Sequence, residues 1–220
     1  CPADSKGIGP AIERANEAKI PVFTADIAAQ GGQIVSHVAS DNLAGGRLAA
    51  DFIAKALNGQ GNVGIVGQPE LQSGLDRELG FKEEMKKYPG IKIVSTLNGG
   101  GVRDRALKAA DDMLQGNSDL KGIFGINDDS ALGALSAAEA RGRNDIVIVG
   151  YDATAEAVKA IQRGSPLKAD VAQQPHEMGA KTIQAIATHF GGGQLEKFIP
   201  VPVKIVDANS LKESGGAPAK

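Results

Sequence analysis

The stretch from Gly122 to Thr154 constrains the fold more than any other part of the chain. A short apolar run, Gly122–Ile126, ends in polar residues, and a helical pattern follows over Asp129–Ala140. A second apolar run, Ile146–Val149, again ends in polar residues. This order predicts a strand, a helix and a second strand, with side-chain chemistry at the end of each strand.

Polar side chains at strand ends are the first candidates for ligand contacts. In open α/β sheets, ligands lie outside the carboxyl ends of the strands. Asn127 and Asp152 end the two runs just described, and Asp26 and Gln173 occupy the same place after other short apolar runs. Carboxylates accept hydrogen bonds and amides both donate and accept them, so this set suits the hydroxyl groups of a polyhydroxylated molecule. The alternative for each residue alone is a helix cap or a turn.

Three further polar residues have structural interpretations. Asp128 is predicted to cap the helix Asp129–Ala140, and Asp41 to cap or turn the chain before the next helix. Arg77 can reach a ligand, but an ion pair that holds its helix to a neighbour is the preferred interpretation.

The remaining sequence repeats the alternation of short strands and helical patterns. Strands separated by roughly 10–15 helical residues predict βαβ units and a parallel sheet with helices on both faces. Two arrangements are compatible with this pattern. Two sheets that face one cleft would bring the polar strand ends together, and the alternative is one sheet with a long edge. The first expected strand is Ile20–Thr24, a last extended piece is expected over Pro200–Val206, and the polar tail Asn209–Lys220 is expected to fray.

Composition excludes several classes of function. The net charge of the 220 residues is −2 with no basic stripe, so a nucleic-acid partner is not expected. The single cysteine, Cys1, rules out an internal disulfide and a cysteine-rich metal site. The three histidines are dispersed and no phosphate-binding loop is present; the glycines of Gly99–Gly101 lack the spacing of a dinucleotide site. We expect no catalytic residue, no metal and no cofactor.

Several segments, in order, resemble the periplasmic sugar-binding proteins of ABC transporters, of the ribose-binding type. The resemblance implies an α/β fold of two doubly wound parallel-sheet lobes joined by a three-strand hinge, and a binding protein rather than an enzyme. Asp26, Asn127, Asp152 and Gln173 match ligand-contacting positions of that family. The segments are IPVFTAD (20–26), VSHVASDNLAGGRLA (35–49), RELGF (77–81), GINDDSALGAL (125–135), IVIVGYDAT (146–154) and ADVAQQPHEMGAK (169–181).

The resemblance also implies an organisation and a set of partners. Crossings between lobes are expected near Ala39–Asp41, near Gln173 and near Val201–Val203. The first lobe would then own 1–39 and 174–201, and the second 40–173 and 202–220. The expected partners are a small sugar or polyol, ABC permease membrane subunits and a chemoreceptor, and the expected location is the periplasm. The effector-binding domain of a LacI-type transcription repressor shares this fold and is the alternative.

The sequence departs from the family at the expected site and at its start. Ile27 and Leu75 align with two ligand-binding arginines, and Gly101 with an aromatic residue that stacks on the sugar. These departures argue against ribose itself and favour another sugar or a polyol. The family's first two βα units and a strand precede the segment that matches Cys1. We therefore expect an incomplete first lobe in the carboxyl-terminal part of a longer protein, with Cys1 an interior residue rather than a lipid-bearing terminus.

Overall fold

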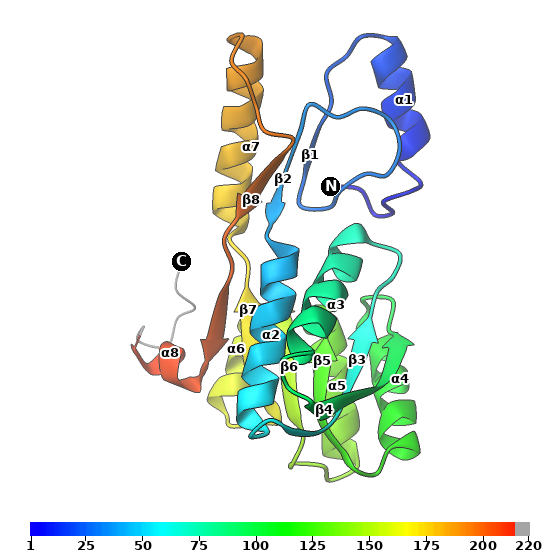
Figure 1. Ribbon diagram of the computed structural model, residues 1–220, viewed down its shortest axis with the longest axis vertical. Coiled ribbons are helices and arrows are strands. Elements are labelled where there is room, and N and C mark those ends of the chain that lie inside the picture. The colour runs from blue at the N-terminus through cyan, green and yellow to red at the C-terminus, as the bar shows by residue number, and fades with distance from the viewer. Residues whose placement is uncertain (214–220) are drawn as a thin grey trace.

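The computed structural model describes residues 1–213, which form two separate β-sheets (Figure 1). The smaller sheet is parallel and has the order β1-β2-β8. The larger sheet has the order β4-β3-β5-β6-β7-β9. The strands are β1 (Phe23–Ala25), β2 (Ser36–Ser40), β3 (Gln60–Gly67), β4 (Gly90–Asn98), β5 (Leu120–Gly125), β6 (Val147–Asp152), β7 (Leu167–Ala172), β8 (Phe198–Val201) and β9 (Lys204–Asp207).

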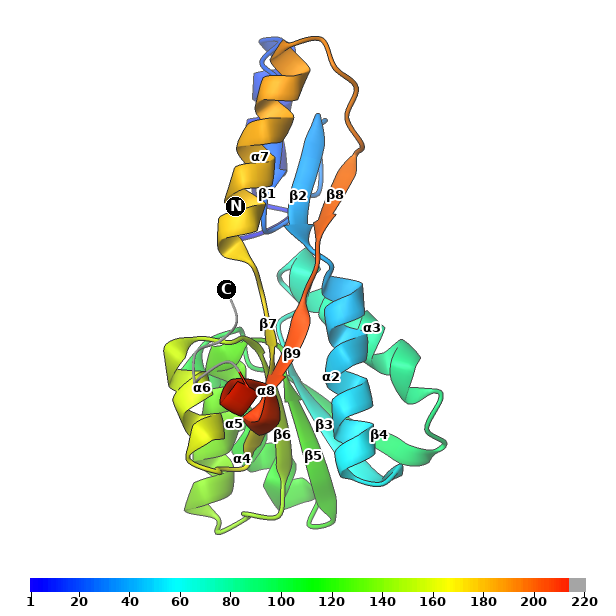
Figure 2. The ribbon, with the colours of Figure 1, turned by 90° about the vertical axis from the view of Figure 1, so that its left-hand side faces the viewer.

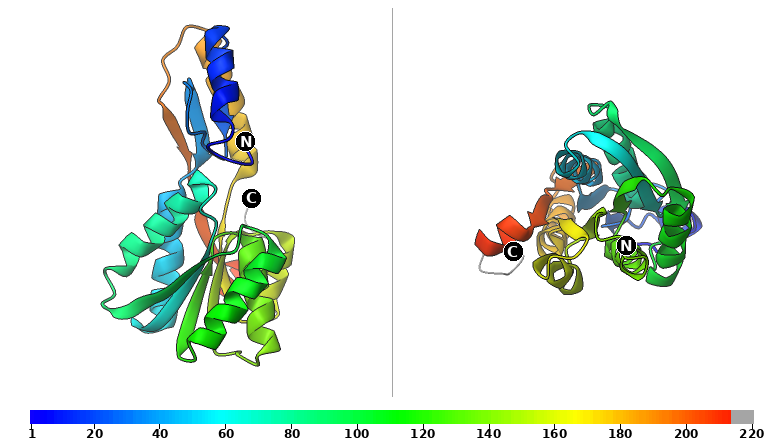
Figure 3. Two further views of the ribbon diagram at one scale, coloured as in Figure 1. Left: turned by 90° about the vertical axis from the view of Figure 1, so that its right-hand side faces the viewer. Right: turned by 90° about the horizontal axis from the view of Figure 1, so that it is seen from below.

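Helices cover both faces of the larger sheet, as its parallel crossovers require. Helices α2 (Asn42–Ala56) and α3 (Gln72–Met85) pack on one face, where Phe81 stacks on Phe124. Three helices pack on the other face, which the left view of Figure 3 shows beside the sheet: α4 (Arg103–Gly116), α5 (Asp128–Ala140) and α6 (Ala155–Gln162). The two cores consist mainly of Ala, Val, Ile and Leu, which suits a chain with few aromatic residues.

Helices α2 and α3 approach each other closely through glycine. A Cβ atom on Gly46 would collide with the backbone of Arg77, and one on Gly80 would collide with the carbonyl of Leu43. Glycine is therefore required at both contacts. This close packing fixes Arg77 of α3 next to the start of α2, and that placement matters for the site described below.

The smaller sheet has a much smaller core. Helix α7 (Pro175–Phe190) packs on it, and Met178 buries itself against Val38 and Val201. Helix α1 (Gly9–Glu17) lies beyond β1, at the far side of this unit in Figure 1. Ile183 and Phe190 of α7 are exposed, at 68% and 71% of their surface.

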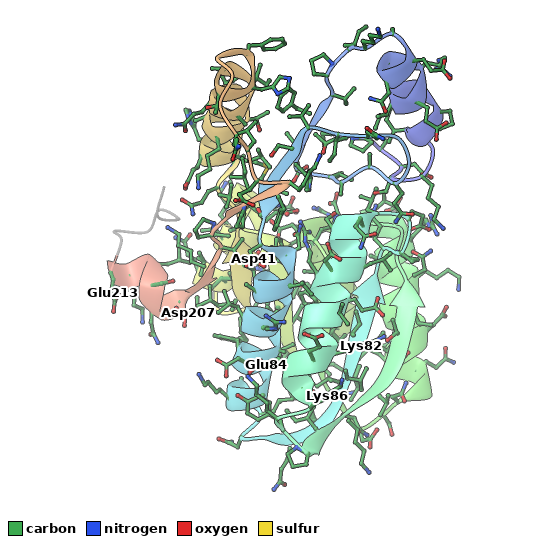
Figure 4. All side chains as sticks on the ribbon, turned by 45° about the horizontal axis from the view of Figure 1, so that its top comes forward. Asp41, Lys82, Glu84, Lys86, Asp207 and Glu213 are labelled. Atoms are coloured by element: carbon green, nitrogen blue, oxygen red, sulfur yellow. The ribbon has the colours of Figure 1, made fainter. Side chains whose placement is uncertain are left out.

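The chain passes between the two sheets at three places, which Figure 2 shows side by side. Asp41 separates β2 from α2, Gln173 and Gln174 separate β7 from α7, and Pro202 with Val203 separates β8 from β9. Asp41 caps α2 as expected, since its Oδ1 accepts a hydrogen bond from the Ala44 amide at 2.9 Å. Figure 4 labels Asp41 where α2 begins, beneath the smaller sheet.

The carboxyl-terminal part differs from the sequence-based expectation in two respects. The extended piece expected over Pro200–Val206 is two strands in different sheets, divided at Pro202, which has no N–H to donate to a ladder. Strand β9 is antiparallel to β7, so the larger sheet carries one antiparallel edge. The expected fraying is wrong for 209–213, which belong to α8 (Ala208–Glu213); the rest of that tail lies outside the described residues.

The first expected strand is shorter and later than predicted: β1 begins at Phe23 rather than at Ile20. Within residues 1–213, no helix has both the length and the apolar character needed to cross a membrane.

Candidate functional site

The two sheets turn their carboxyl edges toward each other. Strand β2 runs into α2 of the larger unit, and β7 runs into α7, which packs on the smaller sheet. Because β1 is parallel to β2, and β5 and β6 are parallel to β7, all these strands end in the region between the sheets. The predicted ligand residues follow or end these strands: Asp26 after β1, Asn127 after β5, Asp152 at the end of β6 and Gln173 after β7.

Two of these four side chains are in direct contact. Gln173 Nε2 donates a hydrogen bond to Asp152 Oδ1 at 2.6 Å. Ser40, the last residue of β2, donates from its Oγ to Gln173 Oε1, also at 2.6 Å. A continuous chain of hydrogen bonds therefore runs from the first crossing, through the second, to Asp152. Sequence reasoning does not identify Ser40 as part of the site, because it lies 133 residues before Gln173 and only the tertiary fold brings the first and second crossings together.

Asn127 occupies the start of α5 and is its N-cap. Its Oδ1 accepts from the Ser130 amide at 2.9 Å, and its Nδ2 donates to the Gly101 carbonyl at 3.0 Å. The prediction that Asp128 caps this helix is wrong, because the helix begins one residue earlier than expected. A carboxamide carries two hydrogens and two lone pairs, so these two bonds leave Asn127 capacity for a ligand hydroxyl.

Asp26 stands apart from the other three residues in its contacts. Its Oδ2 accepts a hydrogen bond from Cys1 Sγ at 3.2 Å, and its amide donates to the Val38 carbonyl. Asp26 has φ of 68° and Asp152 has φ of 121°, so both backbones leave their strands through a conformation that non-glycine residues rarely adopt. Strain of this kind persists only where surrounding contacts enforce it.

Arg77 is buried at the centre of the candidate site, with 6% of its surface exposed. Its Nε donates to Asn42 Oδ1 at 2.9 Å, and its Nη1 donates to the Ile126 carbonyl at 2.9 Å. The guanidinium lies 3.6 Å from the centre of the Tyr151 ring. The ion pair expected for Arg77 is made with Asp152, with 3.8 Å between Nη1 and Oδ1. Arg77 thus joins α3 to α2, to the end of β5 and to the end of β6.

Burial changes the acid–base properties of this end of β6. The pKa of Asp152 is raised to about 6, chiefly because burial removes water from the carboxylate; Arg77 opposes the shift and the nearby Asp128 adds to it. The pKa of Tyr151 is raised to about 12, again chiefly by burial. The side chain of Asp152 keeps 31% of its surface exposed, so the carboxylate remains within reach of a ligand.

Ile27, Leu75 and Gly101 are the positions expected to depart from the ribose-binding type. A side chain is disfavoured at Gly101, because its φ is 67° and a Cβ atom there would displace the end of the Gln68 side chain. Leu75 is 38% exposed and Ile27 is partly exposed. Neither aliphatic side chain can supply the paired N–H groups of an arginine.

Among residues 1–213, no group of three or more His, Cys, Asp and Glu side chains is placed to hold a metal ion. A hollow of about 280 Å³ lies beside the first crossing, where Ser40, Asp41 and Asn42 contribute to its wall together with His37 and Phe198. None of the four predicted ligand residues lines that hollow.

Residues 1–194 match the family model described as periplasmic binding protein domain. The chain belongs to this family. The Escherichia coli protein named ribose import binding protein RbsB is 34% identical over 206 residues, which cover 93% of this chain and 69% of that protein. The Pseudomonas aeruginosa D-ribose/D-allose-binding protein is 32% identical over 219 residues, covering 94% of this chain and 68% of the relative.

Solved structures of the family superimpose closely on this chain. An ABC transporter solute-binding protein from Mycobacterium smegmatis with bound glycerol is 32% identical, with a TM-score of 0.87 over 96% of this chain and 74% of that one. The Caulobacter myo-inositol binding protein is 28% identical, with a TM-score of 0.87 over 97% of this chain and 74% of that one. Fold and family agree with the sequence-based prediction, and the chain is a solute-binding protein rather than an enzyme.

Proposed function

We propose that this chain is the solute-binding component of an ABC-type uptake system and binds a small sugar or polyol between its two sheets. The observation that carries the proposal is the Asp152–Gln173 pair, which stands where the carboxyl edges of the two sheets face each other. An ionised carboxylate beside an amide offers charge-assisted acceptors and a donor to neighbouring hydroxyl groups. The relatives support the class of ligand, since their names include ribose, allose, glycerol and myo-inositol.

In this proposal the ligand contacts come from both sides. Asp26 contributes from the smaller sheet, and Asn127, Asp152 and Gln173 contribute from the larger sheet and the second crossing. The corresponding lobes are 1–39 with 174–201, and 40–173 with 202–220. Hinge bending at the three crossings closes the lobes on the ligand, and contacts from both lobes stabilise the closed form.

The absent arginines limit the ligand. Ile27 and Leu75 offer no hydrogen bonds, and Gly101 offers no ring face. We propose that the ligand is therefore not ribose but another sugar or a polyol, recognised by acidic and amide groups. The permease membrane subunits, and a chemoreceptor, would recognise the closed form in the periplasm.

A ligand screen tests the proposal directly. The melting temperature of the protein would be measured with pentoses, hexoses and polyols, and each positive compound would be titrated by calorimetry. A cognate ligand raises stability by mass action, by about 2.7 kcal/mol at a concentration of 100 times Kd. The proposal fails if the folded protein responds to no compound of the panel, or if Asp152→Ala binds the cognate ligand as tightly as the natural chain does.

A further inference from the structure

Two buried carboxyl groups lie directly behind the predicted ligand residue Asp152. Asp128 opens α5 and Asp170 lies in β7, and 4% and 0% of their surfaces are exposed. One oxygen of each, Asp128 Oδ1 and Asp170 Oδ2, is buried with no hydrogen-bond partner among the described residues. An ionised carboxylate without a partner in such a place is strongly disfavoured.

The two unpartnered oxygens converge on one point. That point is the place of the missing side chain of Gly150, which pairs with Asp170 across β6 and β7. A Cβ atom there would lie 3.0 Å from Asp128 Oδ1 and closer still to Asp170 Oδ2. Glycine at this position leaves room for the two carboxyl groups to meet, and one hydrogen between them satisfies both orphan oxygens.

The other oxygen of each carboxyl group holds the backbone that follows Asp152. Asp170 Oδ1 accepts from the Ala153 amide at 3.0 Å, and Asp128 Oδ2 accepts from the Thr154 amide at 2.6 Å. These are consecutive amides, and both Asp152 and Ala153 have positive φ, of 121° and 55°. The pair therefore fastens the strained turn from which the Asp152 side chain projects.

The surroundings decide which residue carries the hydrogen. Asp128 lies in the first turn of α5, where the helix dipole favours a negative charge. Asp170 lies inside the sheet, and its pKa is raised well above its ordinary value, first by burial and then by the charges of Asp128 and Asp152. The nearest cation on the adjoining strand β9 is Lys204, which pairs with Ala172 rather than with Asp170.

We propose that Asp128 and Asp170 share one hydrogen and act as positioning residues, which fix the Ala153 and Thr154 amides and thereby present the Asp152 carboxylate to the ligand. The part that concerns ligand rests on the proposed function; the shared hydrogen and the held turn do not. Asp128 is the carboxylate and Asp170 the carboxylic acid of the pair.

A cycle of asparagine substitutions tests the shared hydrogen. In Asp170→Asn or Asp128→Asn, one carboxamide N–H group replaces the hydrogen and still faces one carboxyl oxygen. In the double variant, the carboxamide oxygen of each asparagine still accepts from the Ala153 or Thr154 amide. The two carboxamide NH2 groups then face each other, and neither has an acceptor. We expect the double variant to lose more stability than the sum of the two single losses. If the double variant loses no more stability than the two single variants together, the proposal is overturned, because removal of buried charge alone predicts that result.

A pH series separates the shared hydrogen from a plain packing role. The folded chain holds the Asp170 hydrogen more tightly than the unfolded chain does, so its contribution to stability is present below about pH 4 and is lost as pH rises further. Asp170→Asn removes this titration. Its melting temperature relative to that of the natural chain should therefore increase as the pH is raised above about 4, and a difference that does not change with pH would contradict the proposal.

Hydrogen exchange tests the positioning without any ligand. The Ala153 and Thr154 amides should exchange slowly in the natural chain and in both single variants, and much faster in the double variant. With a cognate ligand in hand, Kd should rise roughly ten- to hundred-fold in the double variant. Fast exchange in the natural chain overturns the positioning role even if no ligand is found. The surface variant Asp112→Asn is the control and should change neither measurement.

Discussion

Gln173 Nε2 donates to Asp152 Oδ1 over 2.6 Å, and this bond joins the second crossing between the sheets to the end of β6. A residue of the hinge and a predicted ligand acceptor are thus in one hydrogen-bond chain, which Ser40 continues into the first crossing. A ligand that bonds Asp152 would therefore contact a side chain that is hydrogen-bonded to the second crossing. The site and the hinge are therefore physically connected in this chain.

Removal of the Asp152 carboxylate should weaken binding directly. Asp152→Ala deprives ligand hydroxyls of a charged acceptor and leaves Gln173 Nε2 without its partner. We expect a loss of about 1–3 kcal/mol in binding free energy, measured by calorimetry with the cognate sugar or polyol. Asp112→Ala, which removes an exposed carboxylate that pairs with Lys108, is the matched control and should bind normally. An unaltered Kd in Asp152→Ala would take this residue out of the site.

Binding should depend on pH because the pKa of Asp152 is raised to about 6. The ionised carboxylate is the stronger acceptor, so affinity should increase from about pH 5 to about pH 7 and then level off. The free protein behaves in the opposite sense. A raised pKa means that this group's contribution to stability is complete below about pH 4 and is lost as pH rises through about 6.

Calorimetry at several pH values checks the binding half of this prediction, and chemical denaturation checks the stability half. The variant Asp152→Asn does not titrate, so neither dependence should come from this position. A natural chain whose affinity is the same at pH 5 and pH 7 would show that Asp152 does not accept hydrogen bonds from the ligand.

The candidate site could be predicted from local sequence patterns, because an apolar run that ends in polar residues marks the end of a strand. Asn127 and Asp152 each follow an apolar run, and the carboxyl edge of a parallel sheet gathers such residues wherever the strands lie in it. The same reasoning missed Ser40 and assigned Arg77 to an ion pair without predicting its buried place beside Asp152. Arg77 becomes buried only because Gly46 lets α3 approach α2, and that approach is a property of tertiary packing.

The errors have equally local causes. Asn127 and Asp128 are both good capping residues, and the choice between them depends on whether the Gly101 carbonyl is within reach of the Asn127 amide. The proposed pairing of Asp170 with Asp128 leaves no trace along the chain, since Asp170 lies in the strand β7 and Asp128 lies in the helix α5. The apolar run near Pro200 reads as one strand, and Pro202 divides it between two sheets.

The Ser40–Gln173 bond should affect ligand binding more than its contribution to stability suggests. Ser40→Ala removes the donor to Gln173 Oε1 and should cost about 1 kcal/mol of stability. Because Gln173 then loses its orientation toward Asp152, affinity should also fall several-fold. Ser36 offers a matched control: it is buried in the same strand, and its Oγ donates to the Glu196 carbonyl, away from the site. Denaturation should show similar losses of stability in Ser40→Ala and Ser36→Ala, and calorimetry should show weaker binding in Ser40→Ala alone. Equal affinities would mean that the Ser40–Gln173 bond does not affect ligand binding.

Arg77 should prove essential for the arrangement of the candidate site. Arg77→Met keeps much of the apolar stem but leaves Asn42 Oδ1 and the Ile126 carbonyl without their donor in a buried place. We expect a loss of about 2–3 kcal/mol in the free energy of unfolding. The pKa of Asp152 should rise further, because Arg77 is the main group that opposes its shift. Carboxyl titration by NMR measures that shift, and urea denaturation measures the stability.

Arg47→Met is the control, since the Arg47–Glu83 ion pair is exposed and such pairs contribute at most about 1 kcal/mol. Equal losses in the two variants would mean that the buried guanidinium does not organise this end of the sheet.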